Sequence, residues 1–422
     1  MKLRKIGFLR YRQFIEETLE LDPWVTVLVG RNDTGKTGVL NHFFDQCVYE
    51  GVISGGDRPM VPGYQGDRVA FSLTWQICAH DYDWITFPPE FGDRGDRVLE
   101  ISFRDTNGSG RVWSYSLDGI GLDVYDGTSP EGHAIMRKTW RPRLILPTPR
   151  YVSVMGPPAQ NFEMHPYDQA AGAVEMEQRQ QRKFEHRILS VEARFLQLAG
   201  IRAQTRGPTG MNQPWPMHLG ATCSMSTADL QARLESLAAR VSEKLRAWWV
   251  DPPGLSLKIR LVEGVPRTYG LTWSLQDSAG LVYHGTGLLW FVGFVIEWLS
   301  IEDFPGPLLL LFDEPGTPLH PSAQRAAAKL IGSMSSRHQV IYSTHSPFLI
   351  DWNFPQRIRL FERDYESKRT RILNKPYAPR ESTQRIWDPL RESIGVTIGD
   401  VGILGSRNVL VEGVSDQILI AN

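Results

Sequence analysis

The sequence predicts an α/β fold in which a mostly parallel sheet is joined to an antiparallel β lobe and a helical insertion. Three observations support this fold class. Continuous apolar runs alternate with helical patterns, which is typical of parallel strands covered on both faces. Short runs with a period of two lie between turn signals over about 65–150. Apolar stripes with helical spacing occupy about 165–250.

The parallel sheet is predicted from three buried apolar runs, Trp24–Val29, Leu308–Phe312 and Gln339–Ser343. Helical patterns follow or precede them over residues 37–49, 287–299 and 322–334. Residues 3–14 alternate in the manner of one further strand.

The antiparallel lobe is predicted from four strand-like runs, Val69–Cys78, Val98–Arg104, Val112–Leu117 and Arg143–Leu146. The turn signals TNGSG and YDGTSP lie between them. These signals favour hairpin connections over crossovers.

Two apolar stripes predict helices in the insertion. The first consists of Phe184, Ile188, Val191, Phe195 and Leu198, and the second of Leu230, Leu234, Leu237, Val241, Leu245 and Trp248. Ser226 and Asp229 resemble a capping box before the second stripe. Neither helix is long enough for an extended coiled-coil arm, so both are expected to pack on a core or on each other. A strand pair is expected after residues 251–254.

Composition is that of an ordinary soluble protein, with 41% hydrophobic and 22% charged residues. The formal net charge of −1 argues neither for nor against a nucleic-acid partner. The three cysteines are far apart and show no metal-ligand spacing, which fits a reducing compartment. The N-terminus has no signal-peptide core, and the longest apolar stretch is too short to span a bilayer. We expect a cytoplasmic protein without a membrane partner.

Residues 30–37, GRNDTGKT, fit the pattern G-x-x-x-x-G-K-[ST] between a buried strand and a helix. In this context the backbone N–H groups of the loop form an anion cradle at the helix N-terminus. Lys36 is expected to reach the β- and γ-phosphates of ATP, and the Thr37 hydroxyl is expected to ligate Mg²⁺. The predicted nucleotide-binding residues are Gly30, Asn32, Asp33, Thr34, Gly35, Lys36 and Thr37.

Two acidic residues follow the second buried strand. Asp313 stands at the carboxyl end, where ligands bind in open α/β sheets, and is expected to hold Mg²⁺. Glu314 is expected to orient and deprotonate the attacking water. The alternative is an acidic pair that starts a helix after a core strand. The upstream phosphate loop favours the catalytic interpretation.

His345 follows the third buried strand, one strand after the acidic pair. A histidine at this strand end is placed to sense the γ-phosphate. The alternative is a structural histidine.

In this order the elements resemble the ABC-type ATPases, specifically their SMC-like and OLD-family branch. Asn32 in the loop and the sequence DEP followed by Leu319, His320 and Pro321 are typical of that branch. The resemblance implies that two heads dimerise and enclose ATP, which gives a homodimer or a higher even-numbered oligomer. It also implies an ABC-type ATPase domain over 1–405.

The resemblance places the signature motif at residues 283–291, YHGTGLLWF. Gly285 stands where the family usually has a serine, and the Thr286 hydroxyl and the N–H of Gly287 are the candidates to replace its γ-phosphate contact. Arg150 and Gln160 are candidates for the Q-loop residue.

Residues 408–420, NVLVEGVSDQILI, resemble the opening of a Toprim domain over 406–422. In that domain the first glutamate, here Glu412, assists metal-dependent phosphodiester chemistry. A Toprim fold needs a later Asp-x-Asp pair, which does not occur between Glu412 and Asn422. The domain is therefore either vestigial or, as we expect, continues beyond Asn422.

The resemblance implies an ATPase head that gates a C-terminal Toprim endonuclease acting on DNA, in anti-phage defence. Two alternatives remain. One is an ATP-switched scaffold or sensor that controls a separate effector subunit. The other is a DNA-repair ATPase of the RecF or SMC type.

Overall fold

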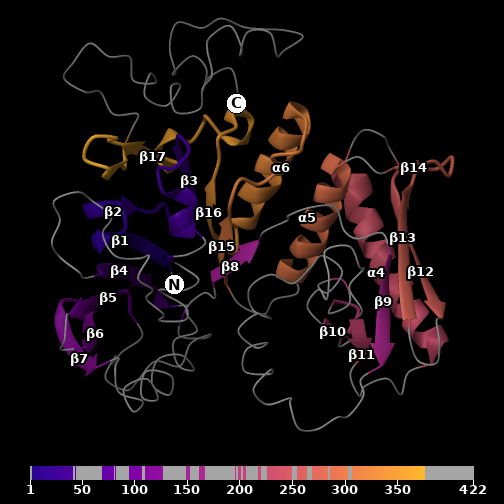
Figure 1. Ribbon diagram of the computed structural model, residues 1–422, viewed down its shortest axis with the longest axis horizontal. Coiled ribbons are helices and arrows are strands. Elements are labelled where there is room, and N and C mark those ends of the chain that lie inside the picture. Colours follow the sequence, from indigo (N-terminus) through magenta and orange to yellow (C-terminus); the bar gives the residue numbers. More distant parts are fainter. Residues whose placement is uncertain are drawn as a thin grey trace, which may run out of the picture. The chain divides into compact units, whose positions relative to one another are not determined.

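A computed structural model divides the chain into two compact units (Figure 1). The first comprises residues 1–151, 306–315 and 328–422, and the second comprises 152–305 and 316–327. The structure describes residues 2–40, 43, 69–79, 81, 95–106, 110–126, 149–152, 161–166, 195, 198–200, 203–205, 217–219, 226–249, 254–263, 269–283, 286–302 and 307–375. In these ranges no helix combines the length and the apolar character that crossing a membrane requires.

The first unit contains the parallel sheet expected from the apolar runs. Four of its strands are parallel neighbours in the order β17 (Ile358–Arg363), β3 (Val25–Gly30), β16 (Gln339–Ser343) and β15 (Leu309–Phe312). The short strands β18 (Thr370–Leu373) and β8 (Pro149–Val152) complete the two edges. Because the four central strands run the same way, their carboxyl ends meet at one edge of the sheet. The predicted α/β class is confirmed.

The same unit contains an antiparallel sheet with the strand order β2-β1-β4-β5-β6-β7. Its strands are β1 (Lys2–Tyr11), β2 (Phe14–Glu20), β4 (Ala70–Ile77), β5 (Arg97–Thr106), β6 (Gly110–Leu117) and β7 (Ile120–Asp126). The prediction of one strand over residues 3–14 is wrong, because the chain reverses at Arg12 and Gln13. Arg12 adopts a left-handed φ of 50°. The turn contains no glycine, proline or asparagine that would have signalled it.

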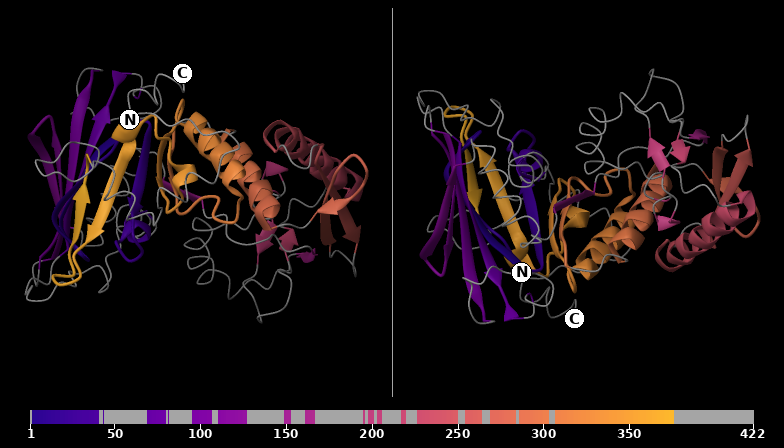
Figure 2. Two further views of the ribbon diagram at one scale, coloured as in Figure 1. Left: turned by 90° about the horizontal axis from the view of Figure 1, so that it is seen from above. Right: turned by 90° about the horizontal axis from the view of Figure 1, so that it is seen from below.

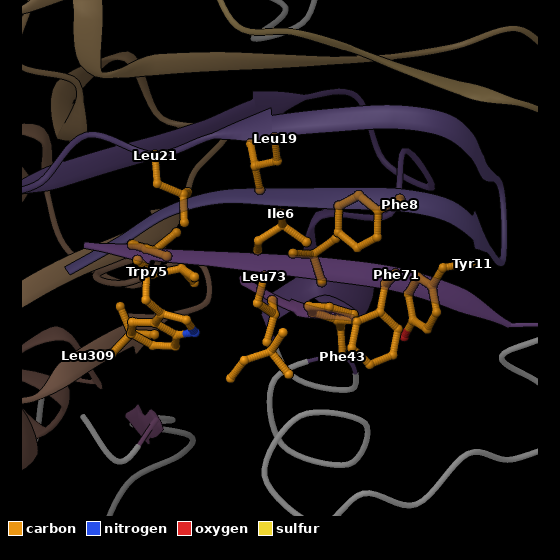
Figure 3. Packing of buried hydrophobic residues seen from close by; sticks show 14 of the residues in the cluster. Ile6, Phe8, Tyr11, Leu19, Leu21, Phe43, Phe71, Leu73, Trp75 and Leu309 are labelled. Carbon is orange, nitrogen blue, oxygen red and sulfur yellow. The ribbon is translucent and has the colours of Figure 1, made fainter. Parts of the chain in front are cut away.

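One hydrophobic core fills the space between the two sheets (Figure 3). Phe8 and Phe71 come from the antiparallel sheet, and Leu309 comes from the parallel sheet. Phe43, which follows the glycine loop in sequence, contacts Phe71 edge to face with ring centroids 4.9 Å apart. Each such buried ring contributes about 1.5–3 kcal/mol relative to an exposed one. This core therefore fixes the segment after β3 against both sheets.

The second unit has a mixed sheet with the path β10-β11-β9-β13-β12 and β14 paired to β13. Its strands are β9 (Asn161–Pro166), β10 (Ala203–Thr205), β11 (Met217–Leu219), β12 (Ser256–Glu263), β13 (Tyr269–Gln276) and β14 (Val282–Tyr283). β12 and β13 form the expected antiparallel pair. The short strands β9 to β11 escaped prediction because so few residues leave no readable period.

Helix α4 (Thr227–Trp248) lies along β12 in this second unit (Figure 2). Its buried stripe includes Leu230, Leu234, Leu237, Val241 and Leu245, as the sequence predicts. Ser226 caps the helix by accepting the N–H of Asp229 at 3.2 Å. Ser242 accepts the N–H of Leu257 at 2.8 Å and thereby ties the helix to the start of β12.

Two further helices agree with the sequence pattern. α5 (Thr286–Glu302) is strongly apolar, and its Trp298 stacks edge to face with Trp248 of α4 at 4.7 Å. α6 (Pro321–Met334) precedes β16. Two single turns, η5 (Pro347–Leu349) and η6 (Pro355–Arg357), lead from β16 to β17. The predicted positions 41, 42, 44–49, 143–146, Phe184, Ile188 and Val191 lie outside the described residues.

Candidate nucleotide-binding site

The candidate site occupies the carboxyl edge of the parallel sheet, within the first unit. β3 ends at Gly30 and leads into the glycine loop, and β15 ends immediately before Asp313. β16 ends at Ser343, two residues before His345, and β17 ends at Arg363. Four strand ends therefore bring together residues that lie far apart in the sequence, such as Asp33 and Arg363, which are 330 positions apart.

The glycine loop is closed by hydrogen bonds from its own side chains. Lys36 Nζ donates to the carbonyl oxygens of Gly30 at 2.7 Å and Arg31 at 2.9 Å. The Thr34 hydroxyl donates to Arg31 O at 2.8 Å. Gly35 has φ of 96°, and a side chain there would collide with Gln13. The loop thus needs glycine at this position for both conformation and space.

Asp313 lies beside the start of the helix that follows the loop. Its Oδ1 accepts the hydroxyl of Thr37 at 3.2 Å and the hydroxyl of Ser343 at 2.5 Å. Ser343 is fully buried, so its hydroxyl holds the carboxylate in place. A hydroxyl and a carboxylate oxygen at this spacing are the oxygen ligands that Mg²⁺ prefers when phosphates and water supply the others.

Glu314 is fixed by three contacts to β16 and the residues after it. Its backbone N–H donates to Ser343 Oγ at 3.0 Å, in a left-handed conformation with φ of 46°. Its Oε2 accepts the N–H of His345 at 3.1 Å, and its Oε1 lies 3.2 Å from His345 Nε2. Burial raises the pKa of Glu314, partly offset by the His345 N–H and by Lys36. A carboxylate of raised pKa suits a general base better than an ordinary one.

His345 Nε2 also lies 3.1 Å from Lys36 Nζ. One imidazole nitrogen thus faces an ammonium group and the carboxylate of Glu314, and it can accept from the first or donate to the second. Burial lowers the pKa of His345, and the neighbouring Lys36 lowers it further. Burial also lowers the pKa of Lys36 to about 8, against the opposing effect of Glu314, Asp313 and Asp33.

A cavity of about 310 Å³ opens over the loop. Besides loop residues it is lined by Arg12, Gln13, Phe14, His345 and Arg363. The arginines and Ser343 were missed by the sequence interpretation. Ser343 sits inside a run read as core strand, and Arg12 sits in a hairpin read as strand. Only the pairing of β17 with β3 brings Arg363 to the loop.

The predicted signature residues lie in the second unit. Thr286 is the first residue of α5, and Gly287 follows it. A side chain at Gly287 would meet the carbonyl oxygen of Pro318 at 2.9 Å, so glycine allows α5 to pack closely on the segment after the acidic pair. Arg150 lies in β8, whereas Gln160, Gly285 and Glu412 lie outside the described residues.

Metal ligands of the His, Cys, Asp and Glu type do not gather in threes anywhere in the described ranges. The Thr37 hydroxyl and the Asp313 carboxylate are oxygen ligands of the kind that Mg²⁺ combines with phosphate and water oxygens.

Comparison with protein families finds a match to an AAA ATPase domain over residues 255–350. This segment contains Asp313, Glu314, Ser343 and His345, and the match supports ATPase activity. An OLD nuclease of Thermus scotoductus is 30% identical over 116 residues, which is 26% of this chain and 21% of the relative. An uncharacterized protein of Methanocaldococcus jannaschii is 30% identical over 118 residues, 27% of this chain and 30% of the relative. The aligned segments thus span less than a third of either relative.

Among solved structures, the chain is similar to SMC head domains. An SMC head bound to the C-terminal winged-helix domain of ScpA has a TM-score of 0.48 at 14% identity, covering 88% of this chain and 97% of the other. The SMC head domain of Thermotoga maritima has a TM-score of 0.46 at 11% identity, covering 88% and 98%.

Proposed function

We propose that this chain is the ATP-binding and ATP-hydrolysing head of an OLD-family DNA endonuclease. One observation carries the ATPase part. Three strand ends bring together Lys36, Thr37, Asp313, Glu314 and His345. Lys36, Thr37 and His345 line one cavity, Asp313 contacts Thr37, and Glu314 contacts His345. These are the residue types that phosphoryl transfer to water requires, because each addresses a different charge or proton of the reaction.

The roles follow from the contacts. The loop amides and Lys36 bind the phosphates, and Thr37 with Asp313 would hold Mg²⁺, which neutralises phosphate charge when bound. Glu314 takes the proton of the attacking water, and the imidazole of His345 holds its carboxylate in position. The hydroxyl of Ser343 holds both acidic residues in place, because it donates to the Asp313 carboxylate and accepts the backbone N–H of Glu314.

The endonuclease part rests on the partial similarity to an OLD nuclease. In this proposal ATP closes a homodimer of heads, in which Thr286 and Gly287 of one subunit face the nucleotide of the other. Hydrolysis reopens the dimer and gates a Toprim nuclease that begins near Glu412 and cuts DNA in defence against phage. Arg150 or Gln160 would serve as the Q-loop residue.

The test of the ATPase combines two variants of the full chain. Lys36→Ala is expected to raise the Kd for Mg–ATP at least tenfold, because it removes the buried cation at the loop. Glu314→Gln is expected to retain binding and to lose turnover by about 10²-fold or more. Ser333→Ala, on the exposed face of α6, is the matched control. Parental binding in Lys36→Ala, or parental turnover in Glu314→Gln, would contradict the assignment.

The gating proposal is tested separately by light scattering and by plasmid cleavage. Glu314→Gln is expected to form a dimer with Mg–ATP and to remain a monomer with ADP. A protein that carries a whole Toprim domain after this ATPase head is expected to nick plasmid DNA, and its Glu412→Gln variant is expected not to. Cleavage that is untouched by Glu412→Gln would overturn the Toprim assignment. Copurification of a separate nuclease or toxin subunit would instead favour an ATP-switched scaffold.

A further inference from the structure

Arg363 reaches the glycine loop from the carboxyl end of β17. Its Nη1 donates to the carbonyl oxygen of Asp33 at 2.7 Å, across 330 positions of sequence. β17 pairs with β3 in parallel, and Phe361 stands opposite Gly30 at the root of the loop. The sheet register therefore places Arg363 beside the crest of the loop, and its side chain lines the cavity.

Asp33 is the residue of the loop with the least favourable backbone. Its φ of 62° lies in the left-handed region, and it is exposed, so packing does not hold it there. A left-handed residue among right-handed ones turns successive N–H groups toward one point, which forms the anion cradle. A residue with a Cβ atom pays free energy for this conformation. A contact from outside the loop must therefore stabilise the left-handed conformation of Asp33.

Arg363 also bears on the charge of the loop. Asp33 is an acidic residue in a loop built for phosphates, and it acts electrostatically on Lys36. The guanidinium brings a permanent positive charge to the same residue. Its Nε is buried, and no hydrogen-bond partner for it occurs among the described residues. The hydrogen bond from Nη1 to Asp33 O thus links this arginine to the loop.

We propose that Arg363 is a positioning residue for nucleotide binding, which holds Asp33 in the left-handed conformation that forms the phosphate cradle. This inference rests on the proposed ATP site. Arg363 acts on the backbone of the loop, whereas the loop amides and Lys36 touch the phosphates.

The direct test measures the Kd of a fluorescent ATP analogue with Mg²⁺. Arg363→Ala is expected to raise this Kd about tenfold, which corresponds to about 1.4 kcal/mol, and to raise KM with a smaller change in kcat. Arg363→Lys is expected to restore part of the affinity, because one ammonium donor still reaches Asp33 O. Arg369→Ala, exposed on the same hairpin, is the matched control. A parental Kd in Arg363→Ala would overturn the inference.

A second measurement separates positioning from a direct contact with phosphate. Arg363→Ala is introduced into Asp33→Gly and into Asp33→Ala. Both backgrounds remove the carboxylate, but only glycine adopts the left-handed conformation freely. The Kd ratio caused by Arg363→Ala is expected to be about tenfold in Asp33→Ala and below threefold in Asp33→Gly. Equal ratios in the two backgrounds would show that Arg363 acts on the ligand itself, and would overturn the inference.

The outcomes also separate this inference from the proposed function. If the parent protein binds no nucleotide, both fail together. If the parent protein binds Mg–ATP and Lys36→Ala does not, the proposed ATP site is supported. The Kd ratios caused by Arg363→Ala then decide whether Arg363 is a positioning residue. Thermal unfolding of each variant, compared with the parent, shows whether a change in Kd reflects a folded protein.

Discussion

The hydroxyl of Ser343 donates to Asp313 Oδ1 at 2.5 Å and accepts the backbone N–H of Glu314 at 3.0 Å. One buried oxygen at the end of β16 thus holds both acidic residues at the end of β15. The two strands are parallel neighbours, with Phe312 opposite Tyr342, so their next residues emerge side by side. The position of Asp313 and Glu314 therefore depends on the neighbouring strand β16 as much as on β15, the strand that they follow.

Ser343→Ala is therefore expected to lower kcat about tenfold to a hundredfold, the usual cost of removing a partner that orients a ligand residue. Nucleotide binding should change less, because the loop and Lys36 remain. Steady-state ATP hydrolysis with a parallel Kd measurement checks this split. Ser335→Ala, which removes only a hydroxyl bonded within its own turn, is the control. Equal losses in kcat and affinity would contradict the orienting role.

Lys36 gives a pH dependence for nucleotide binding. Burial lowers its pKa to about 8 in the ligand-free protein, and bound phosphates must raise it again. Affinity is thus fully present below pH 8. Above pH 8 binding must take up a proton, and Kd is expected to rise by up to about tenfold per pH unit.

Titration of Kd between pH 7 and about 9.5 measures this slope, and Lys36→Arg is the control. Arginine stays charged over this range, so its Kd should be independent of pH even if it is weaker overall. A slope that persists in Lys36→Arg would assign the effect to another group.

His345→Ala is expected to reduce kcat on the order of 10²-fold, the cost of losing one oriented donor at a reacting centre. The imidazole Nε2 of His345 lies 3.2 Å from Glu314 Oε1. Lys36 Nζ lies 3.1 Å from the same Nε2 atom. Burial lowers the pKa of His345, which favours the neutral form of the ring. Single-turnover hydrolysis measures the effect. A variant with parental kcat would leave the histidine a structural residue.

The side chain of Arg12 adds a positive charge to the cavity over the glycine loop. Its Nη1 lies against Gly38, in the first turn of the helix that follows this loop. Arg12→Ala is expected to raise the Kd for Mg–ATP about fivefold, or about 1 kcal/mol. Arg10→Ala, exposed on β1 two residues before Arg12, is the control. Isothermal titration of both variants decides whether the hairpin turn belongs to the binding site.

Leu234 tests the core of the second unit. It is fully buried on α4, and Leu234→Ala is expected to lower the free energy of unfolding by about 2–5 kcal/mol. Ser236→Ala on the exposed face of the same helix should change it by less than about 0.5 kcal/mol. Urea unfolding followed by tryptophan fluorescence measures both. Equal effects would contradict the assigned face of the helix.

Much of this molecule was readable from local patterns. The buried runs at Gln339–Ser343 and Leu309–Phe312 have a continuous apolar character that fixes them as central strands. The stripe of α4 and the loop at Gly30 have residue spacings that few other structures share. The hairpin at Arg12 could not be read, because a charged residue in a left-handed turn leaves no sequence signal.

The sequence by itself determined which residues are candidates for the chemistry: Lys36 and Thr37 follow a strand, and Asp313, Glu314 and His345 follow two others. These assignments depend on which polar residues directly follow a buried strand, and the apolar pattern of the sequence reveals where each such strand ends. Only the tertiary structure decided that Ser343 joins the acidic pair and that Arg363 supports Asp33. The physical reason is strand pairing. A hydrogen bond between residues hundreds of positions apart depends on which strands are neighbours and in what register, and no local pattern contains that information.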